Sequence, residues 1–195
     1  MDIAQRRVLM KNNFEQLMVQ HCAATLAGHK CGSLFAFCTE NEREWRQAVD
    51  ALDALLAPKG VRVRALASCP RGCKVYAYRP AMLARRLEDP QITRFLAQKG
   101  YTDMHQEECL NELGRRIQCE KSFPHEIGVF LDYPLEDVIG FIEHGGRHCA
   151  CAGCWKAYSD EREAKRRFEL YGKCKRVYTD CYHRGTDVAR LTVAV

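Results

Sequence analysis

The sequence of 195 residues lacks several features that would assign it to a common class. It contains no run of 18 apolar residues, which argues against a transmembrane helix, and residues 1–18 contain no continuous apolar segment of a secretory signal. The chain also has no large excess of one kind of charge, because it contains 30 basic and 25 acidic residues and its net charge is +5. We therefore expect a cytoplasmic protein without membrane insertion, and nucleic acid is not an expected partner.

Standard motifs of metal and nucleotide chemistry are absent as well. The cysteines follow neither the four-cysteine ferredoxin spacing nor the paired CxxC spacing of a zinc ribbon. Residues 25–33 lack the spacing of a P-loop, and His125-Glu126 is not a zincin motif because position 129 is Val. Internal repeats and long polar linkers are also missing. The chain is therefore expected to form a single compact domain over residues 1–195.

Cysteine, by contrast, is abundant, with 12 residues in the chain. Thiols stay reduced in the cytoplasm, so disulfides are not their expected role. A chain of this length buries enough surface to fold without disulfides or a metal. The cysteines therefore indicate burial, metal binding or redox chemistry.

Hydrophobic periodicity predicts an α+β (mixed α/β) fold. The sheet is expected to be small and mainly antiparallel, with about three to five strands packed by about six helices. Its clearest part is a hairpin over residues 61–79, with a turn at 68–73. Segment 125–132 reads as a short strand or an irregular buried segment, and 187–195 as a final strand or short helix. Further strands are predicted at 33–38 and 154–158, and helices at 2–22, 40–57, 80–88, 90–99, 104–119, 134–143 and from Ser159 to about Arg184.

The densest group of possible ligands is Cys149, Cys151 and Cys154, three thiols within six residues. Thiolates bind zinc in tetrahedral sites and also hold iron–sulfur clusters. A fourth ligand would come from elsewhere, with His144 and His148 as local options. The alternative is that these cysteines are buried as small apolar residues.

A second group of candidates lies at the end of the first helix and in the loop that follows. Thr25, Lys30 and Ser33 offer two hydroxyls and a cation that suit a carboxylate or phosphate. Cys22 is the candidate nucleophile of this group. Alternatively, His21 and Cys22 only continue the apolar stripe of the first helix.

The candidate bases are His21, next to Cys22, and His125, with Glu126 beside it. If His125 activates Cys22, the two side chains lie within about 3–4 Å of each other. The competing interpretation is that His125 anchors its segment through a hydrogen bond.

Several segments together resemble one family. HCAATLAGHKCGSLFAF (21–37), HEIGVFLDYPLEDVIGFIEHGG (125–146) and CAGCWKAYSDEREAKRRFELYGKC (151–174) are similar to the DUF3793 family of bacterial proteins of unknown function, found mainly in anaerobes. The resemblance implies a stand-alone cytoplasmic domain with flavodoxin-like or iron-transport partners. It implies no reaction. Its recurring positions are His21, Cys22, His125, Glu126, Cys151, Cys154 and Trp155.

Three functions follow as hypotheses. The first is a metal-binding or thiol-redox accessory protein of anaerobic iron metabolism, with zinc or an iron–sulfur cluster held by Cys149, Cys151, Cys154 and Cys22. The second is an enzyme or binding protein for a small anion, in which Thr25, Lys30 and Ser33 hold the ligand. In that case Cys22 reacts with His21 or His125 as the base. The third is a protein-interaction module without a catalytic site.

Overall fold

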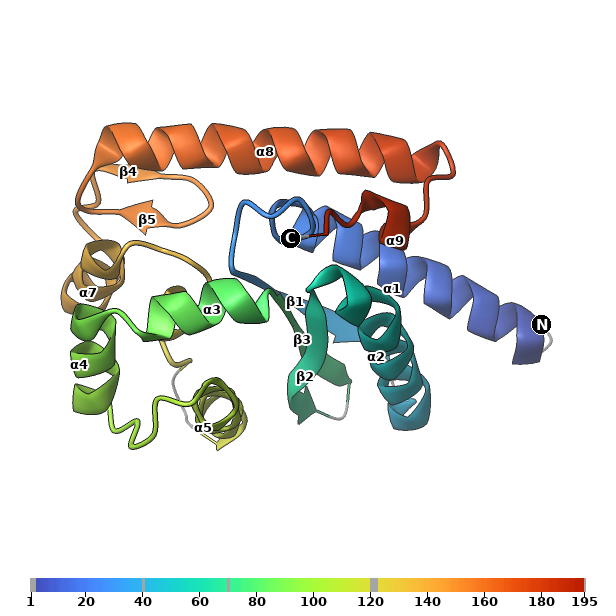
Figure 1. Ribbon diagram of the computed structural model, residues 1–195, viewed down its shortest axis with the longest axis horizontal. Coiled ribbons are helices and arrows are strands. Elements are labelled where there is room, and N and C mark those ends of the chain that lie inside the picture. The colour runs from blue at the N-terminus through green and yellow to red at the C-terminus, as the bar shows by residue number, and fades with distance from the viewer. Residues whose placement is uncertain (1–2, 40, 70, 120–122, 195) are drawn as a thin grey trace.

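The computed structural model describes residues 3–39, 41–69, 71–119 and 123–194, and its centre is a three-stranded antiparallel sheet (Figure 1). The strands are β1 (Gly32–Cys38), β2 (Arg62–Cys69) and β3 (Gly72–Tyr78), in the order β1-β3-β2. The predicted hairpin is confirmed, because β2 pairs with β3 from Arg62 opposite Tyr78 to Cys69 opposite Gly72. The α+β class is confirmed with it.

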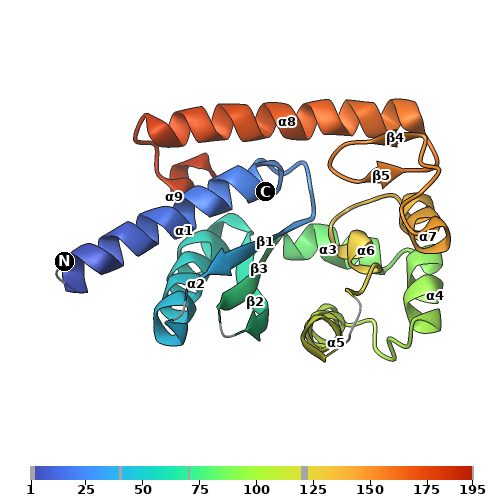
Figure 2. The same cartoon turned by 180° about the vertical axis from the view of Figure 1, so that it is seen from behind.

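Helices surround this sheet. They are α1 (Ile3–Leu26), α2 (Glu42–Leu56) with a 3₁₀ turn (Ala57–Lys59), α3 (Pro80–Leu87), α4 (Pro90–Gln98), α5 (Gln106–Cys119), α6 (Ile127–Phe130), α7 (Leu135–His144), α8 (Glu161–His183) and α9 (Val188–Leu191). A second small sheet of β4 (Cys151–Ala152) and β5 (Lys156–Ala157) lies between α7 and α8 (Figures 1 and 2).

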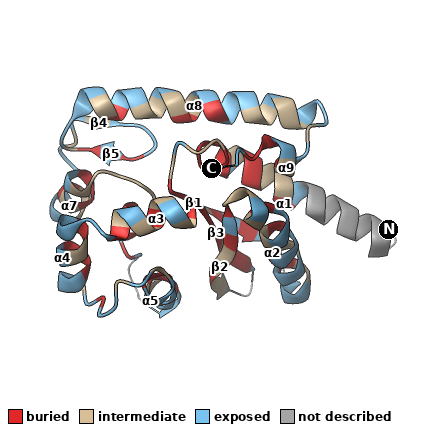
Figure 3. Cartoon of the chain, in the orientation of Figure 1, coloured by how far each residue is buried: buried red, intermediate tan, exposed pale blue. Residues whose placement is uncertain are grey.

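The two faces of the central sheet bury different cores. Alternate residues of a strand point to opposite faces, so Val75 packs among α1 and α2 while Tyr76 packs among α3, α5 and α6. The apolar stripe of α2 forms part of the core on the Val75 face, since Trp45, Val49 and Leu52 recur at helical spacing and are buried. Figure 3 shows buried residues concentrated on the sheet and on the helix faces turned toward it. The sheet is therefore a layer between two groups of helices.

The long helix α8 runs beside α1 and reaches from the C-terminal segment to the small sheet (Figures 1 and 2). Its N-cap is Asp160, whose carboxylate accepts the N–H of Glu163 at 2.9 Å, rather than the predicted Ser159. The helix continues through Gly172 without a break. In this way α8 connects both ends of the molecule.

Segment 125–132 was predicted as a short strand or as an irregular buried segment, and the strand is wrong. The segment contains the single helical turn α6, and all four residues of that turn are buried. A run of apolar residues predicts burial, but it does not distinguish a strand from a buried helix. The predicted strand 154–158 is likewise shorter, since only Lys156–Ala157 pairs, and the C-terminal segment contains the helix α9.

None of the described helices combines the length and the apolar composition that crossing a bilayer requires.

The close packing around Gly32, at the start of β1, leads to a prediction about stability. A Cβ on Gly32 would lie 2.2 Å from the hydroxyl of Tyr76 and 2.5 Å from the carbonyl oxygen of Phe130. We expect Gly32→Ala to lower the free energy of unfolding by about 1–3 kcal/mol, as overpacked sites do. Urea unfolding measures the change.

Gly172→Ala is the matched control, because a Cβ there meets only the Arg176 side chain at 3.5 Å. Alanine has the higher helix propensity, so this variant should gain about 0.5–1 kcal/mol. Equal effects of the two substitutions would contradict the packing described around Gly32.

Candidate functional site

Three segments far apart in the sequence meet around the side chain of Lys30. Lys30 lies in the loop between α1 and β1, next to the loop after α6 and the turn between β4 and β5. α8 contributes two further side chains. We call this group the Lys30 site; it consists of Cys22, Lys30, Cys31, Asp132, Tyr133, Cys154, Arg167 and Tyr171.

The ammonium group of Lys30 has aromatic neighbours but no hydrogen-bonded partner. Its Nζ lies 5.3 Å from the ring centroid of Tyr133 and 5.7 Å from that of Tyr171. Within the described part of the chain, Lys30 takes part in no hydrogen bond and no ion pair. Burial lowers the pKa of Lys30, while the nearby Cys22 and Cys154 act in the opposite direction. The site thus contains a cation that is free to meet a ligand.

Three thiols lie near this ammonium group, and they differ in accessibility. Cys22 and Cys31 are buried, and burial raises the pKa of each to about 12. A thiol with such a pKa stays protonated near neutral pH and is a poor nucleophile. Cys154 is exposed, so it is the thiol of the Lys30 site that a reagent in solution can reach.

Asp132 occupies a strained position at the edge of the Lys30 site. Its φ is +64°, a value that residues other than glycine rarely adopt. Its Oδ2 accepts the backbone N–H of Cys31 at 3.2 Å, and its Oδ1 lies 3.3 Å from Nη1 of Arg86. Arg86 also donates to the carbonyl oxygen of Tyr133. Because Arg86 pairs with Asp132, the charge of Lys30 remains uncompensated.

The charged groups in and around the Lys30 site carry a net positive charge. Lys30, Arg86, Arg166 and Arg167 are cations, whereas Asp132 and Glu163, which pairs with both Arg166 and Arg167, are carboxylates. Arg167 donates from Nε to Glu163 at 2.8 Å and from Nη1 to the carbonyl oxygen of Asp132 at 3.4 Å. Its Nη2 has no hydrogen-bond partner among the described residues. This balance suits a small anionic ligand.

A buried carboxylate on α7 holds the turn that carries Cys154. Asp137 accepts hydrogen bonds from Trp155 Nε1 at 2.7 Å, from the backbone N–H of Tyr158 at 2.7 Å and from the N–H and Oγ of Ser159 at 2.9 and 2.8 Å. Burial favours the neutral acid, but these four bonds favour the carboxylate and lower the pKa of Asp137. Asp137 therefore fixes the small sheet against α7.

Of the three predicted anion ligands, Lys30 lies in the site and the other two bind each other. The hydroxyl oxygens of Thr25 and Ser33 are 2.9 Å apart, and both residues are buried. Each hydroxyl therefore already has a partner within the protein.

The histidines predicted as bases are exposed and contact aromatic rings. The ring of His21 stacks on Phe35 with centroids 5.8 Å apart, and burial of one side lowers the pKa of His21. The ring of His125 meets that of Phe141 at 4.9 Å. No hydrogen bond joins His125 to Cys22 in the described structure, so the expected pair is not formed.

Glu126 is buried in a polar network between α5 and the segment before α6. Its Oε1 lies 3.3 Å from Nη1 of Arg116 and accepts the hydroxyl of Tyr101 at 3.5 Å. These contacts join α5 to the segment before α6. They give Glu126 a structural role in this arrangement.

The cysteines predicted as metal ligands divide between two places. Cys22 and Cys154 lie at the Lys30 site, whereas Cys149 and Cys151 lie near Tyr158 and α8. Across residues 3–39, 41–69, 71–119 and 123–194, no three His, Cys, Asp or Glu side chains form a group that could hold a metal ion. Coordination by these cysteines stays a prediction.

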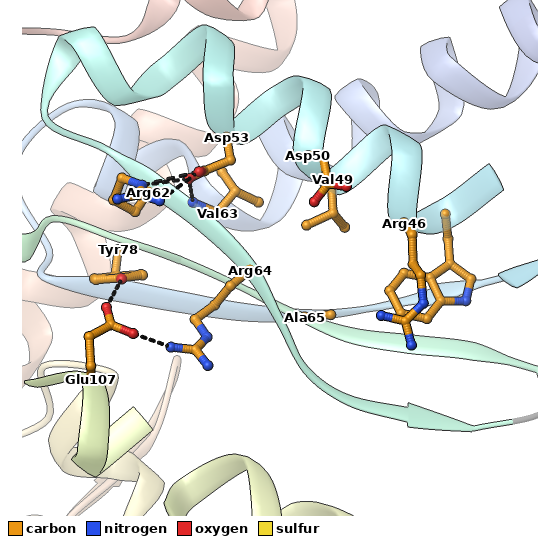
Figure 4. A pocket seen from close by; sticks show the side chains of 11 residues that line it. Arg46, Val49, Asp50, Asp53, Arg62, Val63, Arg64, Ala65, Tyr78 and Glu107 are labelled. Carbon is orange, nitrogen blue, oxygen red and sulfur yellow. Dashed lines mark hydrogen bonds and ion pairs between the residues drawn. The ribbon is translucent and has the colours of Figure 1, made fainter. Parts of the chain in front are cut away.

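A groove of about 410 Å³ between α2, β2 and α5 is a weaker candidate (Figure 4). Arg62 pairs there with Asp53 at 2.8 Å, and Arg64 pairs with Glu107 at 2.9 Å. Because these charges compensate each other, the groove attracts a charged ligand less strongly than the unpaired ammonium group of Lys30 does.

Sequence reasoning did not find the residues that the α6–α7 loop and α8 bring to the Lys30 site. Asp132 and Tyr133 follow a buried apolar run directly, and Arg167 and Tyr171 are four residues apart on one helix face. Asp137 lies on the buried side of a predicted apolar helix. The signal that the sequence offered was a polar residue within an apolar pattern. This signal is weak at each of these positions.

Comparisons with known proteins assign the chain to a family. A family model described as a protein of unknown function, DUF3793, matches residues 18–192. No curated protein and no solved structure matches the chain. All eight residues of the Lys30 site fall within the matched segment.

The hydrogen bonds of Asp137 predict a pH-dependent stability. A carboxyl group whose pKa is lowered by folding stabilises the protein above its unfolded pKa, near 3.9, and loses this effect as the pH falls through the folded value. We expect Asp137→Asn to cost about 2–3 kcal/mol at pH 7 and to reduce the loss of stability between pH 5 and the acid range. Urea unfolding followed by tryptophan fluorescence measures both effects.

Asp160→Asn serves as the control, since asparagine caps a helix as well as aspartate does. It should change the stability at pH 7 by less than about 0.5 kcal/mol. An Asp137→Asn variant as stable as this control would show that the four bonds contribute little.

Proposed function

Because the chain belongs to the DUF3793 family, whose members are of unknown function, we propose its function from the Lys30 site itself. The protein binds a small anionic ligand through Lys30, and the exposed thiol of Cys154 is the reactive group beside that ligand. The observation that carries this proposal is the unpaired, partly buried ammonium group of Lys30 between two tyrosine rings.

The surroundings of Lys30 support binding of an anion rather than of a cation or a neutral apolar molecule. Asp132, the carboxylate of the site, is already occupied by Arg86 and by the N–H of Cys31. Lys30 and Nη2 of Arg167 are left as donors without acceptors in the described structure. Either donor can pair with a carboxylate oxygen.

Cys154 supports the thiol part of the proposal by its position. Its side chain is close enough to Lys30, Tyr133 and Tyr171 to influence the pKa of each, so it lies near the place where the anion would bind. The hydroxyl of Tyr133 donates to its carbonyl oxygen at 3.3 Å. A thiolate beside a cation is the usual form of a reactive cysteine. A free thiol of this kind fits a reducing, cytoplasmic environment.

Alkylation with two reagents of similar size tests this function. Iodoacetate is an anion and iodoacetamide is neutral, so a cationic site raises the reaction rate of its cysteine with iodoacetate relative to iodoacetamide. We expect this ratio to be about tenfold higher at Cys154 than at the exposed Cys119 in the same chain. Peptide mass spectrometry of the full chain gives both rates.

Lys30→Met should abolish the preference at Cys154, because it removes the cation. Lys99→Met is the matched control, since Lys99 also lies over an aromatic ring, 5.6 Å from the centroid of Phe95, but outside the Lys30 site. A ratio at Cys154 equal to that at Cys119, or one unchanged in Lys30→Met, overturns the proposal.

A second candidate is a cysteine-based metal-binding or thiol-redox accessory protein of anaerobic iron metabolism. What supports it is the sequence, which places Cys149, Cys151 and Cys154 within six residues near the end of α7, although no group of three metal ligands forms in the part of the chain that the structure describes. There the rings of His144 and His148 are 6.3 Å apart, and Cys149 follows His148, whose φ is +57°. Imidazole and thiolate groups are typical ligands of zinc. Flavodoxin-like or iron-transport proteins are the partners that this function implies.

Metal analysis of protein purified without oxygen tests this candidate. If a metal binds there, about one equivalent of zinc or iron remains after purification, and Cys149→Ser lowers it strongly. Cys109→Ser is the control, because Cys109 is buried between helices elsewhere. Less than about a tenth of an equivalent of any metal would exclude a resident metal.

A further inference from the structure

We propose that the outer edge of β1 binds an extended acidic peptide segment of a partner protein, which adds to the central sheet as a further strand. The surface concerned consists of Leu34, Ala36 and Cys38 of β1 together with Arg71 and Lys74, and we call it the β1 edge. It shares no residue with the Lys30 site, so this inference does not rest on the proposed function.

The first argument is the direction of the backbone groups of β1. β1 is the end strand of the order β1-β3-β2. The N–H of Thr39 donates to the carbonyl oxygen of Arg71 at 2.9 Å, so the odd-numbered residues of β1 bond toward β3. Leu34, Ala36 and Cys38 alternate with them and point their N–H and C=O groups outward. These outward groups have no hydrogen-bond partner among the described residues.

The two edges of this sheet differ in how they are protected. On β2, the N–H of Val63 donates to Asp53 at 2.7 Å and the N–H of Ser68 donates to Gln118 at 2.8 Å. The register of β2 also shifts between residues 65 and 67. Such features prevent pairing with another chain. β1 has a regular register over its seven residues and contains no charged residue and no proline, so its edge is open to a further strand.

A groove beside this edge can receive the side chains of an added strand. The groove has a volume of about 250 Å³ and is lined by Ala36, Ala67 and Ile117, among others. Ala36 and Cys38 are exposed, and Figure 2 shows β1 on the near side of the sheet. Every second side chain of an added strand points to the same face of the sheet as Ala36. Apolar side chains at these positions therefore enter the groove.

Two cations at the groove determine the charge of the partner. Lys74 lies opposite Ala36 in the β1–β3 register, and Arg71 lies in the turn between β2 and β3. Neither side chain takes part in an ion pair or a hydrogen bond within the described structure, and the described lining of the groove contains no Asp or Glu. A partner with carboxylates compensates both charges. β1 itself contains no acidic residue, so a second copy of the chain paired through the same strand is a poorer match.

Fluorescence anisotropy with two labelled peptides tests this inference on the full chain. The acidic peptide TETVTETV places glutamate and valine on one face of a strand, and the basic peptide TKTVTKTV differs only by lysine in place of glutamate. We expect the acidic peptide to bind about tenfold more tightly. Lys74→Glu should reduce or reverse this preference, a result that loss of folding does not produce. Lys99→Glu is the matched control outside the β1 edge and should leave the preference unchanged.

A proline substitution tests the backbone contribution. The N–H of Ala36 points outward, so Ala36→Pro removes a donor for the added strand without removing a bond between β1 and β3. We expect it to weaken binding of the acidic peptide about tenfold. In the unsubstituted chain, the bound acidic peptide should slow alkylation of Cys38 by iodoacetamide but not that of Cys154, and peptide mass spectrometry measures both rates.

Three results overturn the proposal. The first is equal affinity for the two peptides, or no binding of either at about 1 mM. The second is binding of the acidic peptide that neither protects Cys38 nor responds to Ala36→Pro, because the peptide then binds elsewhere. The third is a chain that sediments as a dimer and becomes a monomer in Ala36→Pro, because a second copy then occupies the β1 edge.

Discussion

The guanidinium of Arg79 is buried at the junction of α1, the central sheet and the C-terminal segment. It donates to the carbonyl oxygens of Thr25, Leu26 and Val193 at 2.7–2.8 Å, and its exposed fraction is 2%. The last carbonyl groups of a helix lack partners within the helix and carry a partial negative charge, so they compensate a buried cation without a carboxylate. The backbone N–H of Arg79 also donates to the carbonyl oxygen of Cys31 at 2.8 Å. These bonds fix both ends of the loop that presents Lys30.

Two further charged side chains, one buried and one half-buried, position the remaining parts of the Lys30 site in the same manner. Asp137 gathers the donors of the segment after the β4–β5 turn, and Arg86 gathers acceptors of the loop around Asp132. Each of these side chains bonds to at least two backbone groups of an irregular segment, which has no regular secondary structure to satisfy them. Segments without regular hydrogen bonding therefore keep one conformation, and Lys30 meets Tyr133 and Cys154 in a defined arrangement.

Much of the fold could be predicted from the sequence because it depends on local pattern. The hairpin of β2 and β3 follows from alternation across a Gly-containing turn, and α2 follows from its apolar stripe. The candidate site was predicted less well. Lys30, Cys22 and Cys154 were singled out and lie together, but Thr25 and Ser33 bond to each other. Whether a hydroxyl faces a ligand or a neighbour depends on distant residues, and sequence spacing does not encode it.

The sequence by itself determined that the chain is an α+β domain with an antiparallel hairpin and a loop at the end of α1 that carries a cation. It did so because helical and strand periodicities are local properties of the chain. The tertiary structure alone decided that Asp132, Tyr133, Arg167 and Tyr171 surround that cation, since three loops and a helix meet there. It also decided that Lys30, rather than the cysteines, is the centre of the site: burial keeps Cys22 and Cys31 protonated, whereas Arg86 takes the carboxylate that would have neutralised the lysine.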